Sequence, residues 1–124
     1  MKVIIAGGRD FDNYEYLSET MKSLNIIVSE VVCGGAQGAD SLGEKWAQIN
    51  GIPVKYFPAD WDGLGNYAGH ARNKQMAEYA DFLVAFWDGK SKGTQNMIST
   101  MQQLGKHGKV MRYEQKGMCA TYPW

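Results

Sequence analysis

The sequence predicts an α/β protein, a three-layer sandwich in which a mostly parallel sheet of about five strands lies between two layers of helices. Two observations predict this fold. Short apolar runs alternate with segments of helical periodicity along the chain. The apolar runs are also continuous rather than alternating with polar residues, which is typical of parallel strands covered on both faces. Repeated alternation of strand and helix implies right-handed crossovers within one sheet.

Five segments have the length and the β-branched or aromatic content of strands, and most of them end at Gly, Pro or Asp. They are residues 3–6, 30–33, 54–57, 82–86 and 109–112. The tail, residues 118–124, shows no pattern, and Pro123 and Trp124 are expected either to pack on a neighbour or to be loose.

Four segments between the strands carry apolar residues at helical spacing. The first is predicted to begin at a capping box formed by Asp12 and Glu15. The second is predicted to end at Gly51, the third lies around residues 76–80, and the fourth ends near Gly105. The regular order of elements, without a linker or an internal repeat, predicts one domain over residues 1–124.

Composition excludes several classes of protein. A hydrophobic fraction of 44% and a charged fraction of 21% are values of a globular chain rather than a disordered one. Thirteen basic residues balance thirteen acidic ones, whereas a non-specific nucleic-acid binder normally carries a basic excess. Cys33 and Cys119 form no CxxC pair, so we expect no metal site. With no signal peptide and no apolar run of about 20 residues, we expect a cytoplasmic protein without a membrane partner.

Three glycine-bearing segments directly follow predicted strands, at residues 7–11, 34–40 and 87–94. Ligands of parallel α/β sheets bind outside the carboxyl ends of the strands, where glycines expose backbone N–H groups and helix N-termini attract anions. Tight strand-to-helix turns also need glycine for purely structural reasons. The candidate ligand-binding residues of these segments are Gly7, Gly8, Arg9, Asp10, Gly34, Gly35, Ala36, Gln37, Gly38, Asp40, Gly93 and Thr94.

Four further candidates lie between the third predicted strand and the third helix, namely Asp60, Trp61, Arg72 and Asn73. Arg72 is predicted near a helix N-terminus, and Arg9 follows a Gly-Gly turn, so both guanidinium groups suit a phosphate. The alternative is that each arginine forms a structural ion pair with Asp10, Asp40 or Asp60. The carboxylates equally suit a ribose hydroxyl, a general base or an ordinary turn.

Five short motifs occur in order along the chain: GGRDF at 7–11, GGAQGAD at 34–40, PADW at 58–61, AGHARNKQM at 68–76, and AD at 80–81 with GT at 93–94. In these motifs the chain closely resembles the SLOG superfamily of Rossmann-like domains, over about residues 2–112. Within the superfamily it is similar to the small YspA-type, cpYpsA-related branch of phage and bacterial proteins.

The resemblance implies a Rossmann-like fold and a nucleotide or NAD-derived ligand, which the protein would sense or sequester, as in signalling between phage and host. We accordingly expect a small-molecule partner, no resident cofactor and a homo-oligomer. The alternative is an enzyme acting on a nucleotide or nucleoside, an N-glycosidic hydrolase or transferase, with Asp10, Asp40 or Asp60 as its carboxylate.

Two relatives within the superfamily bear on these alternatives. The LOG-type enzymes cleave the glycosidic bond of nucleoside monophosphates with a Glu three residues after a Gly-Thr pair. The chain carries Met97 at that position, so hydrolysis in the LOG manner is not expected. The DNA-processing DprA proteins suggest DNA as a ligand, but the zero net charge argues against it.

Overall fold

The computed structural model describes residues 1–8, 11–34, 39–57, 68–113 and 119–123, with backbone alone at 39–40, 68–70 and 119–123. Six strands in this part of the chain form one sheet, in the order β3-β2-β1-β4-β5-β6. The strands are β1 (Lys2–Gly7), β2 (Glu30–Cys33), β3 (Val54–Tyr56), β4 (Phe82–Trp87), β5 (His107–Tyr113) and β6 (Cys119–Pro123). Strands β1 to β5 run parallel, and β6 pairs with β5 antiparallel.

The strand order reverses at the pair β1 and β4. From β1 the sheet grows outward through β2 to β3, and the chain then returns to place β4 on the other side of β1. Doubly wound sheets bind their ligands at such a switch point, because the loops leave the two central strands in opposite directions and open a space between them. The topology therefore marks the carboxyl ends of β1 and β4 as the place to look for a site.

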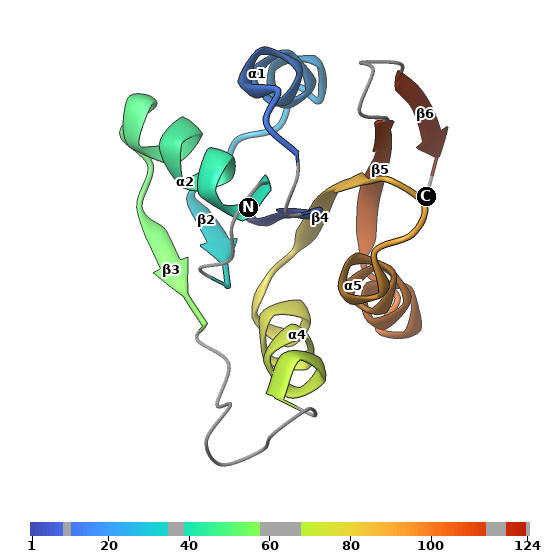
Figure 1. Ribbon diagram of the computed structural model, residues 1–124. Helices are drawn as coiled ribbons and strands as arrows, with labels where there is room; N and C mark the ends of the chain where they lie inside the picture. Colours follow the sequence, from blue (N-terminus) through green and yellow to red (C-terminus); the bar gives the residue numbers. More distant parts are fainter. Residues whose placement is uncertain (9–10, 35–38, 58–67, 114–118, 124) are drawn as a thin grey trace.

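Helices cover both faces of the sheet (Figure 1). The helices α1 (Tyr14–Ser23) and α2 (Ala39–Ile49) lie on one face, and α4 (Ala68–Tyr79) and α5 (Lys92–Gln103) lie on the other. This arrangement confirms the predicted three-layer sandwich. Within the described part of the chain, no helix has both the length and the apolar character needed to cross a membrane.

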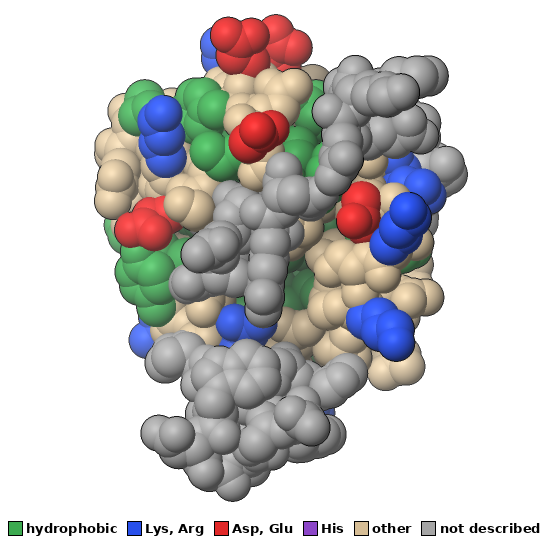
Figure 2. Space-filling model, in the orientation of Figure 1, with side chains coloured by type: hydrophobic (Ala, Val, Ile, Leu, Met, Phe, Trp, Pro, Cys, Tyr) green, Lys and Arg blue, Asp and Glu red, His purple; other side chains and the backbone are tan. Residues whose placement is uncertain are grey.

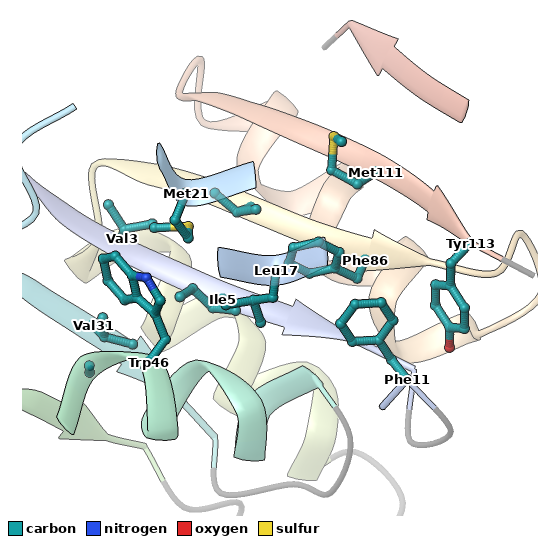
Figure 3. Close-up of a cluster of buried hydrophobic side chains, with 12 residues drawn as sticks. Val3, Ile5, Phe11, Leu17, Met21, Val31, Trp46, Phe86, Met111 and Tyr113 are labelled. Carbon is teal, nitrogen blue, oxygen red and sulfur yellow. The ribbon is translucent and has the colours of Figure 1, made fainter. Parts of the chain in front are cut away.

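The core is divided by the sheet into two clusters of buried side chains. One packs α1 and α2 against the sheet and includes Ile5, Leu17 and Trp46 (Figure 3). The other packs α4 and α5 against the opposite face and includes Met76 and Met97. Successive residues of β1 point alternately to the two clusters, which explains why the apolar run of this strand is continuous.

The five predicted strands begin and end within two residues of their predicted positions. A sixth strand was not predicted, and two other predictions are wrong. The tail forms β6, which pairs with the edge of β5. The predicted capping box fails because the side chain of Asn13, and not Asp12, accepts a hydrogen bond from the backbone N–H of Tyr16. The backbone of Asp40, predicted in a loop, is the second residue of α2.

The helix ends at glycine are as predicted. Gly51 and Gly105 adopt φ angles of 67° and 71° just beyond α2 and α5, where a side chain would be strained. The end of α4 is capped by a lysine side chain from a distant part of the sequence. The Lys106 ammonium donates to the carbonyl oxygens of Ala77, Glu78 and Ala80 at 2.6–2.8 Å. These bonds satisfy carbonyls that have no partner within the helix.

One glycine inside a helix sets the distance between α2 and the sheet. A Cβ atom added at Gly43 would lie 2.8 Å from both the Cβ and a γ-carbon of Ile5 on β1. Ile5 is fully buried, and its Cβ cannot move independently of the strand backbone.

We therefore expect Gly43→Ala to destabilise the protein by up to about 2 kcal/mol. Overpacking costs about 1–3 kcal/mol, and the better helix propensity of alanine offsets about 1 kcal/mol of it. Urea unfolding measures the change. The matched control is Gly93→Ala in α5, where an added Cβ meets nothing within 4 Å. Equal stability of both variants would show that α2 does not need this close approach.

Candidate functional site

The loops at the switch point are held together by the backbone of β1 and β4. Gly7 pairs with Phe86 across the two parallel strands, and the N–H of Gly8 donates to the carbonyl of Phe86 at 3.1 Å. The N–H of Phe11 donates to the carbonyl of Gly8 at 3.3 Å. Gly7 and Gly8 thus lie at the carboxyl edge, as predicted.

Phe11 packs into the hydrophobic core next to the end of β1. Its ring is buried, stacks on Phe86 with a centroid distance of 4.6 Å, and meets the edge of Tyr113 at 4.9 Å (Figure 3). An aromatic cluster of this kind fixes the chain through packing rather than through contact with a ligand. The sequence analysis placed Phe11 in the GGRDF motif but did not predict this packing role. An aromatic residue that follows a glycine pair within a few positions is a signal for it.

Arg72 of α4 lies across Gly34, the residue that follows β2. Its Nη1 donates to the carbonyl oxygen of Gly34 at 3.0 Å. A Cβ at Gly34 would come within 2.2 Å of Nη1 and 2.7 Å of Cζ, so only glycine admits the guanidinium here. The two residues are 38 positions apart in the sequence, and the fold brings them together.

The position of Arg72 in its helix differs from the prediction. Because α4 begins at Ala68, Arg72 is the fifth residue and belongs to the second turn rather than to the N-terminus. Its guanidinium nevertheless has an incomplete set of partners. The Nε atom is buried and has no hydrogen-bond acceptor in the part of the chain that the structure describes. A buried donor without a partner costs free energy, which an anionic ligand would recover.

Asn73, the next residue, ties α4 to the start of α5. Its side chain is 6% exposed, and its Nδ2 donates to the carbonyl of Gly93 at 3.1 Å and to Oδ1 of Asn96 at 3.0 Å. Both N–H groups of the amide are therefore engaged by the protein. Adjacent residues of one helix turn hold Gly34 on one side and Gly93 on the other, so both glycine segments are fixed to α4.

The N-terminus of α5 is capped by Ser91, whose Oγ accepts from the N–H of Thr94 at 3.4 Å and contacts the Thr94 hydroxyl at 3.1 Å. Thr94 is buried and is used by the cap. The N–H groups of Lys92 and Gly93 lie in the first turn, where a helix offers no acceptor, and no described residue accepts from them. The first turn of α5 itself contains no acidic residue.

Tyr56, at the carboxyl end of β3, was not predicted as a site residue. The Glu44 carboxylate beside its hydroxyl raises the pKa of Tyr56 to about 12. The phenol therefore stays protonated at neutral pH, because its pKa lies far above it. It can donate a hydrogen bond there, but it cannot act as a general base.

Met97, at the position of the LOG-type glutamate, belongs to the core. Its side chain is 2% exposed and packs in the cluster that contains Ile4 and Met76. No described group of His, Cys, Asp and Glu is arranged to hold a metal ion.

The other candidates fall partly or wholly outside the described residues. Of Asp40 the structure gives the backbone alone. The alternative ion-pair partners of Arg72, which are Asp10, Asp40 and Asp60, lie outside the described side chains. The candidates outside the described residues are Arg9, Asp10, Gly35, Ala36, Gln37, Gly38, Asp60 and Trp61.

Comparison with known proteins points to one family. The model of the YspA, cpYpsA-related SLOG family matches residues 1–63, which are 63 of the 124 residues. The Gene 61 protein of Mycobacterium phage D29 is 38% identical over 81 residues, which cover 60% of this chain and 65% of the phage protein.

Among solved structures, DNA processing protein A (DprA) from Streptococcus pneumoniae has a similar fold, with a TM-score of 0.71. The similarity covers 91% of this chain but 50% of DprA, so the chain spans half the length of that protein. At 16% sequence identity the likeness concerns the fold alone.

Proposed function

This chain belongs to the YspA, cpYpsA-related SLOG family, and we propose that it binds a nucleotide or NAD-derived small molecule at the carboxyl edge of its sheet. In this proposal the protein senses or sequesters the molecule rather than converting it. The likeness to a phage protein suits a role in signalling between phage and host. We also propose that the protein is cytoplasmic and forms a homo-oligomer.

One observation carries the proposal. Arg72 and Asn73 bring Gly34 and the N-terminus of α5 to the same turn of α4, and both sides offer unused donors. Among the described residues, neither the Nε of Arg72 nor the N–H groups of Lys92 and Gly93 have an acceptor. A phosphate supplies several acceptor oxygens with negative charge, which suits a guanidinium and a helix N-terminus together.

The packing of Met97 supports binding over hydrolysis in the LOG manner. A carboxylate at this position would lie in an apolar cluster, away from water and without a partner. The distribution of charge on the surface also argues against DNA as the ligand, as the zero net charge of the sequence does. On the face shown in Figure 2, Lys and Arg side chains are interspersed with acidic ones rather than gathered into a stripe.

Isothermal titration calorimetry of the purified chain tests the proposal, with AMP, ADP-ribose, cyclic ADP-ribose variants, NAD and GTP as ligands. We expect saturable binding of at least one of them, weakened when salt is raised because the contacts are charged. Chromatography of the same samples should show uncleaved nucleotide. A folded protein that binds none of the panel would contradict the proposal, and rapid release of free base would favour the enzyme.

A further inference from the structure

We propose that Arg112 and Trp87 are positioning residues that lock the turn between β4 and α5 and thereby fix the direction of the α5 N-terminus. The consequence for ligand binding rests on the proposed function, whereas the positioning itself does not. The sequence analysis placed Arg112 at the end of a predicted strand and Trp87 at the start of a glycine-bearing segment. The structure gives both side chains another use.

The two residues are neighbours in the sheet. Trp87 ends β4 and is in register with Arg112 on β5. The guanidinium carbon of Arg112 lies 5.4 Å from the centre of the Trp87 ring, a cation–π geometry that holds both side chains in place. One face of the Trp87 ring is therefore covered by Arg112.

From this pair the guanidinium reaches the turn itself. Nη2 of Arg112 donates to the carbonyl of Asp88 at 3.4 Å. Gly89 follows with a φ of 85°, and a Cβ added there would lie 2.4 Å from Nη2. Position 89 thus requires glycine both for its left-handed backbone and for the space that Arg112 occupies.

The turn then leads directly into the helix cap. Oδ1 of Asp88 accepts from the N–H groups of Lys90 and Ser91 at 2.8 Å each, and the indole N–H of Trp87 donates to the carbonyl of Ser91 at 3.1 Å. Ser91 caps α5 through Thr94. Arg112 thus holds the carbonyl of Asp88, and Asp88 and Trp87 in turn hold Ser91, so the cap can rotate only if this set of contacts opens.

The orientation of the cap sets the direction of the N–H groups of Lys92 and Gly93, which have no acceptor among the described residues. Asn73 holds the same helix end from the side of α4, and Arg112 holds it from the side of β5. A site that relies on backbone donors needs this rigidity, since backbone N–H groups cannot adjust by changing a rotamer. Arg112 acts through the turn and need not touch the ligand.

Amide hydrogen exchange of the full chain tests the positioning without any ligand. In Arg112→Gln we expect the amides of Lys90, Ser91 and Thr94 to exchange at least about tenfold faster, with little change at core amides such as Val84. The matched control is Lys109→Gln, which removes a positive charge from the same strand without touching the turn. Unchanged exchange at the turn, or equal acceleration at all amides, would overturn the proposal.

Titration with the nucleotide panel tests the consequence for binding. Arg112→Gln and Gly89→Ala should both weaken the wild-type affinity about tenfold or more, since each disturbs the same turn, while Lys109→Gln should bind as wild type. If wild type binds and both variants bind equally well, the positioning role in binding is wrong. If wild type binds nothing, the proposed function fails, and the exchange rates still decide whether Arg112 locks the turn.

Discussion

Replacing Met97 by glutamate is expected to lower the free energy of unfolding by about 3–5 kcal/mol and to produce no nucleosidase activity. The side chain is 2% exposed in an apolar cluster, so the new carboxylate would be buried without a partner. Urea unfolding measures the stability, and chromatography of AMP and CMP incubations detects free base. The control Met97→Leu keeps the volume and should cost less than about 1.5 kcal/mol.

The result bears on how the protein differs from LOG-type relatives. If Met97→Glu were as stable as Met97→Leu and released free base, the side chain of residue 97 would have to reach the ligand rather than the core. That outcome would contradict the packing of α5 described above and would favour an enzyme from which a single carboxylate is missing.

Replacing Arg72 by alanine is expected to weaken nucleotide binding by about 1.5–3 kcal/mol, roughly 10- to 150-fold in Kd. The guanidinium combines a bond to Gly34 with a buried Nε that lacks an acceptor, so the variant loses a charged donor to the ligand. Arg72→Lys should recover only part of the affinity, because an ammonium cannot reproduce the planar fork. The matched control is Lys74→Ala, which removes an exposed positive charge from the same helix.

The same variants separate binding from structure. Removal of Arg72 also takes one hydrogen bond from the Gly34 carbonyl, for which we expect a loss of stability of about 1 kcal/mol. A variant that unfolds at much lower denaturant concentration but binds with wild-type affinity would show that Arg72 serves the fold alone. Equal losses of affinity in Arg72→Ala and Lys74→Ala would point to a general effect of charge.

The sequence predicted the layers and the parallel strands because these depend on local patterns. Continuous apolar runs identify strands buried on both faces, and the glycines after α2 and α5 end those helices through a backbone conformation that glycine favours. The strand β6 could not be predicted in this way. It is defined by its pairing with the edge of β5, and such pairing depends on tertiary context more than on residue type.

The candidate site was predictable to a similar extent. The glycine segments were found because ligands of parallel sheets bind at the carboxyl edge, and the structure brings Gly8, Gly34 and Gly93 there. The uses of individual side chains were not predictable. Asn73 suits a ligand as well as a helix terminus, and only the packing of α4 against α5 shows that its amide donates to Gly93. The contact of Arg112 with Trp87 likewise depends on the register of two strands.

The central claim, a phosphate-bearing ligand at the carboxyl edge, is tested most directly by the amide spectrum of the ¹⁵N-labelled protein during titration with AMP and then ADP-ribose. We predict shifts that saturate at Gly34, Lys92 and Gly93, with none at Lys2 and His107, where β1 and β5 begin at the opposite edge. Absence of any shift at millimolar ligand, or shifts confined to the opposite edge, would contradict the account.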